Sequence, residues 1–517
     1  MTATDTSLQG DQAQTTGSGN AAGEGADTRV DRELLLVAGV VVLGVIMTIL
    51  DTTVVNVAIP TLAKTFNTTL PTIQWVATGY TLALATVIPL SGWIADRFGT
   101  KRLYTMSIVM FVFGSALSGL AWSSTSIIVF RVIQGLGGGM ILPAGMTILT
   151  KAAGPQRIGR VMSIMGVPIL IGPILGPILG GWLTADVSWH WIFFINVPIG
   201  IVAVALALKV LPRDVAAHEQ KFDLLGLCLL SPGLAIMIYG LAKSNPGGFG
   251  QETVIGPIAI GVLLLAGFVF HALRTRDPLV DLRLFLDRTF TTSSITLLLV
   301  VISVFGSFLL LPLYFQAVRG ASALQSGLLL APQGLGSMIT MPIAGQLSDR
   351  TGPGRIVPFG LILVALSVLA LTQIGANTSY VLLEAILFVF GLGMGFTMMP
   401  VFTGAMQSMR EAMVARASTA LNIIQQTGAS IGTAVLSVVL ATAISSELGP
   451  AAKGGIGATI GLSDAARAKI AAPMADAFGH TFWWATALLV IALIGSLALP
   501  RHKPELAHGA SPAAAVI

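Results

Sequence analysis

Three ionisable side chains, Asp51, Arg131 and Glu384, lie clearly inside long apolar stretches of this chain. A charge at the centre of a bilayer costs at least about 2.5–3.5 kcal/mol on insertion scales, so such groups usually face a partner or a wet cavity. Asp51 and Arg131 have opposite signs and lie at comparable depths in their stretches. We therefore predict that they interact, directly or through a water, and that the carboxylate gains and loses a proton. The alternative is a fixed ion pair that only joins two helices.

Polar residues accompany these charges at helical spacing. Those that we expect to line a cavity with the ion pair are Thr48, Thr52, Asn56 and Gln134. Such side chains suit a wet pocket better than a surface that faces lipid. Glu384 is also a candidate cavity residue, but it lies near the end of its stretch. For Glu384 we favour the alternative, in which its carboxylate reaches the water at the lipid headgroups.

The composition places the chain in a membrane. Its 517 residues are 54% hydrophobic and 10% charged, with a mean hydropathy of +0.86, whereas soluble domains carry about 25% charge. The single Cys228 excludes a disulfide framework and a cysteine-based metal site. The six histidines form no metal-ligand spacing, and the chain has no Walker-type phosphate loop. We therefore expect neither an enzyme nor a cofactor or metal, and no step driven by ATP.

One short sequence occurs twice. GWIADRFG at 92–99 recurs as GQLSDRTG at 345–352, 253 residues later, each time where an apolar stretch ends in charge. Repeats of this kind indicate two related helical bundles around a central site. A six-helix bundle needs only roughly 200 residues at one span of roughly 20 residues plus a loop for each helix. The distance of 253 residues between the two copies exceeds this length. The difference predicts two further spans between the bundles.

The apolar stretches fit this arrangement. We predict an all-α membrane protein with fourteen spans, near 34–59, 73–95, 103–122, 126–149, 161–183, 191–211, 224–243, 254–273, 290–315, 324–346, 356–375, 380–402, 417–443 and 481–499. The predicted parts are a disordered tail at 1–33, a first six-helix bundle at 34–211, two inserted helices with linkers at 212–289, a second six-helix bundle at 290–500 that contains a long extracytoplasmic loop at 444–480, and a tail at 501–517. Within that loop, the alanine-rich stretch 465–472 could form a helix.

The basic residues predict the orientation. With a cytoplasmic N-terminus, the cytoplasmic segments hold 21 of the 28 lysines and arginines, and the outer loops hold six. This imbalance is the positive-inside distribution of membrane proteins. It explains the pI near 9.5 without a nucleic-acid partner, and it predicts that both tails are cytoplasmic.

The repeated segment also has a mechanical interpretation. A carboxylate between two helix ends can bind an arginine or a helix N-terminus, and such a contact can latch one conformation. The alternative is a tight turn with orienting charge. The residues that we assign to the latch are Gly92, Asp96, Arg97, Gly99, Lys101 and Arg102 in the first copy, and Gly345, Asp349, Arg350 and Gly352 in the second.

The fifth predicted span is rich in glycine and proline. Gly172, Gly176 and Gly180 recur every four residues, which gives a smooth face for close helix packing. Pro173 and Pro177 each remove a backbone donor and favour a kink. We predict a bent, flexible helix packed at a seam between the bundles. The alternative is that glycine and proline are common in membrane helices.

These motifs resemble the major facilitator superfamily, and more narrowly its fourteen-helix drug:proton antiporters of the EmrB/QacA type, over about residues 34–500. The segments that carry the resemblance are LDTTVVNVAIP at 50–60, GWIADRFGTKR at 92–102 with its copy at 345–355, RVIQG at 131–135, the stretch from Gly166 to Gly181, and WHWIFFINVPIG at 189–200. His190 departs from the family, which usually has arginine there, and so puts any role of that charge in doubt.

The resemblance implies a transporter of the plasma (inner) membrane that exports amphipathic or cationic drug-like compounds in exchange for protons, driven by the proton-motive force. Arg131 matches an arginine associated with proton coupling, and the 166–181 stretch is typical of exporters. The rival interpretations are a dedicated exporter of one metabolite or antibiotic, proton-driven uptake, and an enzyme or receptor on a carrier fold. An accessory export partner is left open.

Overall fold

The computed structural model describes residues 32–68, 70–154, 157, 172, 175–176, 178–212, 222–243, 250–407, 409–410, 413–448 and 464–501. All regular structure within these ranges is helical. Twelve of the helices are long and apolar enough to cross a membrane, and a bent helix pair brings the number to 13. These candidates coincide with all the predicted spans except 161–183, most of which falls outside the described residues. The all-α membrane fold is confirmed, and the count of fourteen stays a prediction.

The first bundle begins with a helix much longer than a bilayer requires. Its described elements are α1 (Arg32–Thr65), α2 (Leu70–Ile73), α3 (Trp75–Val87), α4 (Leu90–Phe98), α5 (Thr100–Gly119), α6 (Ser124–Ala153), the π-helix η1 (Leu183–Val187), α8 (Trp191–Phe194) and α9 (Asn196–Val210). The axes of α3 and α4 differ by 53°. The bend falls beside Pro89, where the missing backbone N–H interrupts the helical hydrogen bonds.

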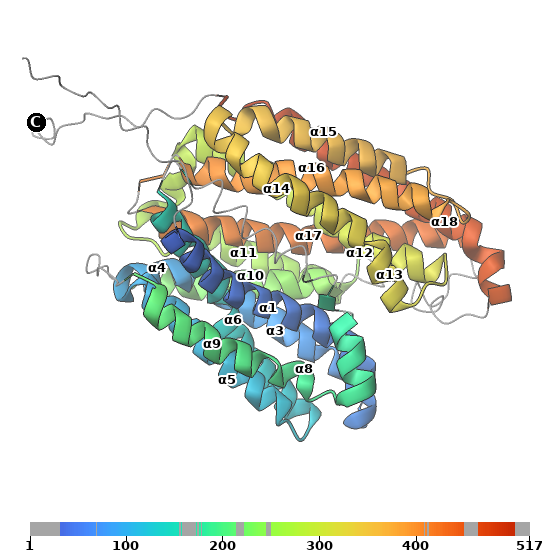
Figure 1. The fold of residues 1–517 in the computed structure, drawn as a ribbon, viewed down its shortest axis with the longest axis horizontal. Coiled ribbons are helices and arrows are strands. Elements are labelled where there is room, and N and C mark those ends of the chain that lie inside the picture. Colours follow the sequence, from blue (N-terminus) through green and yellow to red (C-terminus); the bar gives the residue numbers. More distant parts are fainter. Residues whose placement is uncertain are drawn as a thin grey trace, which may run out of the picture.

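The inserted pair and the second bundle follow. Their described elements are α10 (Leu224–Lys243), α11 (Glu252–Arg274), the 3₁₀ helix η2 (Leu282–Leu286), α12 (Arg288–Ala317), α13 (Ala323–Leu329), α14 (Ala331–Thr351), α15 (Pro353–Leu371), α16 (Tyr380–Gln407), α17 (Val414–Leu448) and α18 (Asp464–Ser496). In Figure 1 the bundle of α1–α9 lies below that of α12–α18, with α10 and α11 between them. Helix α10 packs on α3 of one bundle and α17 of the other.

The two copies of the repeated segment have the same backbone geometry. In the first copy α4 ends at Gly99, which has φ +95°, and α5 follows directly. In the second copy α14 ends at Gly352, with φ +80°, and α15 follows. Glycine is the residue that adopts positive φ without strain. The shared glycine therefore encodes the same sharp helix–helix connection in both bundles.

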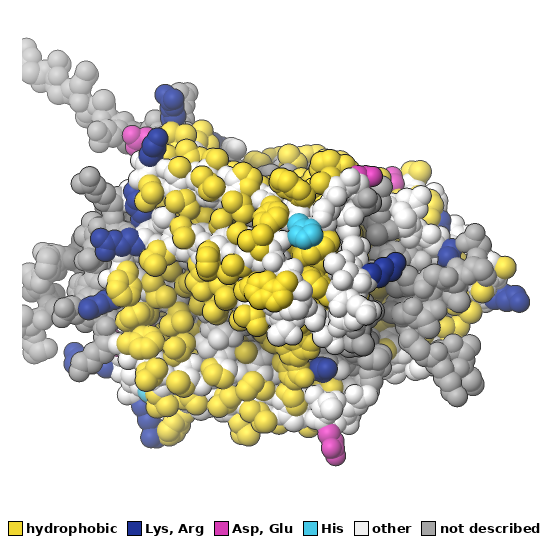
Figure 2. Space-filling view, turned by 90° about the horizontal axis from the view of Figure 1, so that it is seen from below, with side chains coloured by type: hydrophobic (Ala, Val, Ile, Leu, Met, Phe, Trp, Pro, Cys, Tyr) yellow, Lys and Arg dark blue, Asp and Glu magenta, His cyan; other side chains and the backbone are white. Residues whose placement is uncertain are grey.

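The surface suits a membrane. Figure 2 shows hydrophobic side chains over most of one face, with lysines and arginines gathered toward the left end, where Figure 1 places α4. Only 17% of the apolar window of α11 is buried, against 33–61% for the other spans, which indicates that α11 faces lipid.

The prediction of a loop over 444–480 is wrong at both of its ends. Helix α17 continues to Leu448, and 464–480 forms the first half of α18. This segment is rich in alanine, the strongest helix former. It also buries Met474, Ala475 and Phe478 in the core. Tertiary packing therefore extends the helix that we considered only over 465–472 to the whole of 464–480.

Candidate functional site

The two oppositely charged residues of the first bundle form a buried ion pair. Asp51 projects from the middle of α1 and Arg131 from α6, and Arg131 Nη1 donates to Asp51 Oδ2 at 2.5 Å. The exposed fractions of the two side chains are 0% and 1%. The interaction predicted from the two charges is therefore direct. Whether Asp51 carries a proton during function stays a proposal.

Two amides complete the environment of the carboxylate. Gln134 Nε2 donates to Asp51 Oδ1 at 2.8 Å, and Asn196 Nδ2 donates to the same oxygen at 3.0 Å. Arg131 Nη1 also donates to Gln134 Oε1 at 2.8 Å. We call Asp51, Arg131, Gln134 and Asn196 the buried cluster. Three helices, α1, α6 and α9, contribute to it, and each oxygen of the carboxylate accepts at least one hydrogen bond.

Aromatic rings and a backbone carbonyl hold the guanidinium. The Tyr80 ring lies 4.0 Å from Arg131 Cζ, and the Phe193 ring lies 5.8 Å away. Arg131 Nε donates to the carbonyl of Val76 at 3.2 Å. A cation over an aromatic face gains roughly 0.5–2 kcal/mol, most where water is excluded. The arginine is thus fixed on several sides and cannot leave the carboxylate without large rearrangement.

The other predicted cavity residues do not bond to the carboxylate of Asp51. Thr48 and Thr52 hydrogen-bond to carbonyls of their own helix, those of Val45 and Thr48. The Thr52 side chain also reaches Tyr80, the residue whose ring lies over Arg131. Asn56 is exposed, and Glu384 is half-buried near the start of α16 in the second bundle. Asn196, Tyr80 and Ser115 were not predicted. The signal for Asn196 was a polar residue inside the WHWIFFINVPIG segment.

A second group of charges joins the two bundles. Arg416, in the first turn of α17, binds Asp96 of α4 through Nε and Oδ2 at 3.4 Å. Its Nη1 lies 3.7 Å from Oδ2 of Asp281, which precedes η2. We call Asp96, Asp281 and Arg416 the inter-bundle cluster. Asp96 also lies near the N-terminus of α17, whose partial positive charge favours a carboxylate.

Close packing surrounds the inter-bundle cluster. The hydroxyls of Ser91 and Thr419 lie 3.0 Å apart, and Ser418 Oγ donates to the carbonyl of Pro143 at 3.2 Å. A Cβ at Gly92 would lie 3.0 Å from Thr419 Oγ1. The first glycine of the repeated motif is therefore the residue that lets α4 approach α17. The end of the molecule predicted to be cytoplasmic is closed by these contacts.

The remaining motif residues have varied positions. Lys101 Nζ donates to the carbonyls of Leu208 and Leu211 at 2.8 and 2.7 Å and so caps the end of α9. The exposed members are Arg97, Arg102 and Arg350, whereas Gly345 is buried. The Asp349 side chain lies outside the described part of the structure.

The glycines of the fifth span contact α1. A Cβ on Gly172, Gly176 or Gly180 would meet, respectively, Ile49, Thr53 and Val54. Thr53 Oγ1 also donates to the carbonyl of Gly172 at 3.2 Å. These contacts lie inside the first bundle, on the stretch of α1 that carries Asp51, and not at the seam between bundles that we expected. Gly166, Pro173 and Pro177 fall outside the described residues.

His190 has local partners at the end of the first bundle. Its Nδ1 lies 2.7 Å from Ser188 Oγ, and its ring stacks on Trp189 with centroids 3.8 Å apart. These contacts position the ring next to the start of α8. They do not link it to the buried cluster.

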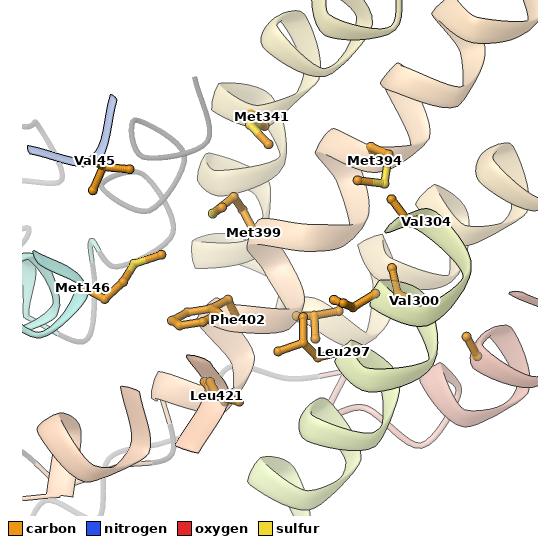
Figure 3. Close-up of a cluster of buried hydrophobic side chains, with 14 of the residues drawn as sticks. Val45, Met146, Leu297, Val300, Val304, Met341, Met394, Met399, Phe402 and Leu421 are labelled. Carbon is orange, nitrogen blue, oxygen red and sulfur yellow. The ribbon is translucent and has the colours of Figure 1, made fainter. Parts of the chain in front are cut away.

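Apolar residues rich in methionine lie where the two bundles face each other, toward the ends of α6 and α16. Figure 3 shows Met146 of α6 pointing toward α16, where Met399 and Phe402 lie, with Met341 of α14 above them in the view. All four are buried members of one hydrophobic cluster. Methionine is flexible and polarizable, so such a surface can adapt to differently shaped apolar groups.

Comparison with known proteins fits this geometry. The family model of the Major Facilitator Superfamily matches residues 41–433, and the chain belongs to this family. It is 43% identical over 494 residues to the multidrug resistance protein B homolog of Mycobacterium tuberculosis (strain ATCC 25618 / H37Rv), with 92% of each chain covered. It is 31% identical over 405 residues to the tetracenomycin C resistance and export protein of Streptomyces glaucescens, covering 78% of this chain and 75% of that protein.

Solved structures show the same fold. The human organic anion transporter MFSD10 (TETRAN) aligns with a TM-score of 0.57 at 14% identity, over 88% of this chain and 99% of that one. The proton:xylose symporter XylE aligns with a TM-score of 0.56 at 14% identity, over 89% and 94%. The chain is therefore a multi-pass membrane transporter with the major facilitator fold.

Proposed function

We propose that this protein exports amphipathic or cationic organic compounds in exchange for protons, from the plasma (inner) membrane and with both termini in the cytoplasm. The names of its relatives support export of drug-like compounds. The excess of lysine and arginine in the segments predicted to be cytoplasmic supports the orientation. The energy source in this proposal is the proton-motive force, because the sequence contains no Walker-type loop for ATP.

The observation that carries the proposal is the buried carboxylate of Asp51. It has no contact with solvent, and a guanidinium and two amides hydrogen-bond to it. Binding of a proton removes the negative charge and with it the attraction for Arg131. A proton on Asp51 therefore changes how tightly α1 is held to α6. Intramembrane acids that pair with a base in this way commonly serve as proton relays.

The inter-bundle cluster supplies the coupled movement. Opening the end that carries Asp96 must separate α4 from α17, and so must break the contacts of Arg416 with Asp96 and of Ser91 with Thr419. Alternating access requires such a rocking of one bundle against the other. In this proposal the proton and the organic compound each favour a different one of the two states, and the two move in opposite directions.

Transport in proteoliposomes tests the proposal. Ethidium and a neutral dye would be followed under an imposed pH gradient with wild type, Asp51→Asn and Glu384→Gln. We expect gradient-driven movement of both dyes by wild type, its loss in Asp51→Asn, and its retention in Glu384→Gln, which removes another intramembrane carboxylate. Gradient-driven transport by Asp51→Asn at the wild-type rate would contradict the role of Asp51.

A dedicated exporter of one compound is the second candidate. It is favoured by the relative from Streptomyces glaucescens, whose name specifies a single compound, tetracenomycin C. Movement of neither dye by folded wild-type protein would favour this candidate. The search would then turn to one native metabolite or antibiotic as the exported compound.

A further inference from the structure

Asn196 brings a third helix to the carboxylate of Asp51. It is the first residue of α9 and is 2% exposed, and its Nδ2 lies 3.0 Å from both Asp51 Oδ1 and Ser115 Oγ. Ser115, on α5, donates its own proton to the carbonyl of Phe193 at 2.9 Å. The amide is therefore fixed between a carboxylate and a hydroxyl whose proton is directed elsewhere.

The packing of α5 makes this arrangement possible. A Cβ on Gly114 would lie 2.6 Å from the backbone of Gln134. The absence of that Cβ lets α5 approach α6 at the level of the buried cluster. Ser115, the next residue, is consequently close enough to hold Asn196.

A protonated Asp51 would need a partner with different chemistry. The ionised carboxylate only accepts hydrogen bonds, whereas the acid also donates one. Arg131 has no acceptor. Gln134 presents Nε2 to Asp51, and turning its amide would take Oε1 away from Arg131. Rotation of the Asn196 amide by half a turn would place its oxygen where Nδ2 lies, and the Ser115 hydroxyl could turn to donate to that oxygen.

We propose that Asn196 is a positioning residue that holds Asp51 in both protonation states and sets the pH at which it takes up a proton. The proposal rests on the proton-coupled function above. Arg131 from α6 and Tyr80 from α3 are the charged and titratable groups that face Asp51 among the described residues. The side chains from α9 and α5 in this network, Asn196 and Ser115, are neutral. Asn196 therefore acts through its hydrogen bonds and not through charge.

Infrared spectroscopy of the purified protein tests this inference without any transported compound. The signal is the band of a protonated carboxyl that is present in wild type and absent in Asp51→Asn, followed as a function of pH. Asn196→Leu removes a charge-assisted hydrogen bond from the ionised form and a weaker neutral one from the acid. We therefore expect the pH at which half of this band is lost, its midpoint, to rise by up to about one pH unit, the difference between the two bonds. The band should also change frequency, because the acid loses its acceptor.

Two further variants sharpen the test. Asn422→Leu is the matched control, because Asn422 is a buried amide on α17 that bonds only to its own helix in the contacts described, through Nδ2 and the Ser418 carbonyl. We expect it to leave the midpoint unchanged. Ser115→Ala should raise the midpoint by less than Asn196→Leu, because it frees the amide without removing it.

The outcomes separate the two proposals. A wild-type midpoint in Asn196→Leu would overturn the role of Asn196. If Asn196→Leu does not fold, Asn196→Asp replaces it: two adjacent carboxyls then share a proton, which should raise the midpoint by more than one unit because like charges disfavour ionisation. An unchanged midpoint there would equally overturn the inference. Dye transport by wild type tests the proton-coupled function independently.

Discussion

Two of the aspartate–arginine contacts in the described part of the structure have contrasting geometry. Asp51 and Arg131 belong to one bundle, lie 2.5 Å apart and are almost completely buried. Asp96 and Arg416 belong to different bundles, lie 3.4 Å apart and each keep 11% of their side-chain surface exposed. The first pair has amides on its carboxylate, whereas the second shares its arginine with another carboxylate, Asp281.

The contrast separates two ways in which an ion pair can respond. A rigid-body movement of one bundle leaves the first pair intact, so only a change of protonation can release it. The same movement pulls the second pair apart, so its energy contributes directly to the balance between closed and open states. Proton uptake therefore depends on the pair of Asp51 and Arg131, and separation of the bundles depends on the pair of Asp96 and Arg416. Mutations can alter the two processes separately.

The largest expected effect comes from removing the base of the first pair. Arg131→Leu leaves a buried carboxylate without its counter-charge, and breaking a buried pair in this way costs about 3–5 kcal/mol. We expect a clear loss of thermal stability in detergent. The double variant Asp51→Leu/Arg131→Leu should recover much of that loss. Equal stability of the single and double variants would show that the charge of Asp51 is not what the arginine offsets.

An intermediate effect is expected from the second pair. Arg416→Gln removes both ionic contacts of the inter-bundle cluster and should favour the open state about tenfold, or about 1.4 kcal/mol, as expected for a charge-assisted contact. The measurement is the rate of thiol labelling at Ser418→Cys in a Cys228→Ser background, because Ser418 is buried at the contact between the bundles.

The matched control for labelling is Ser303→Cys, which is equally buried but lies inside the second bundle, against the carbonyl of Ala485. Its labelling should not change with Arg416→Gln. Faster labelling at both positions would indicate general loosening instead of opening between the bundles.

The smallest effect is that of salt. Partly exposed charges are screened at high ionic strength, whereas buried pairs are screened much less. Raising the salt concentration to about 1 M, where the Debye length is about 3 Å, should accelerate labelling at Ser418→Cys by only a few-fold and leave Ser303→Cys unchanged. An absence of any response at Ser418→Cys would mean that charge contributes nothing measurable to the closed state.

The sequence was most informative where physics leaves few alternatives. Two opposite charges in apolar stretches had to find partners, and the contact between Asp51 and Arg131 followed from that requirement. Asn196 was not predictable in the same way, because a neutral amide at the end of an apolar stretch is equally compatible with headgroup water. Its role depends on the approach of α5 and α9, which only the fold reveals.

The partner of Asp96 was also beyond the sequence. The repeated motif marked Asp96 as a candidate latch, but Arg416 is 320 residues away and has no distinctive local pattern. The helix over 464–480 was predicted only in part, over 465–472, for a related reason. Its alanines are compatible with a loop or a helix until Met474 and Phe478 are seen to pack into the core.

The position of α10 has a consequence for the lipid around the transporter. Leu234 and Ile238 of α10 line the same small hollow as Ile88 at the α3–α4 bend and Ile423 of α17. Helix α10 thus covers one flank of the boundary between the bundles. At this flank it takes the place that lipid acyl chains would otherwise occupy. When the bundles rock, they must either slide along α10 or move it with them. The flank that α10 covers therefore differs from the opposite flank in how it contacts the lipid during the movement.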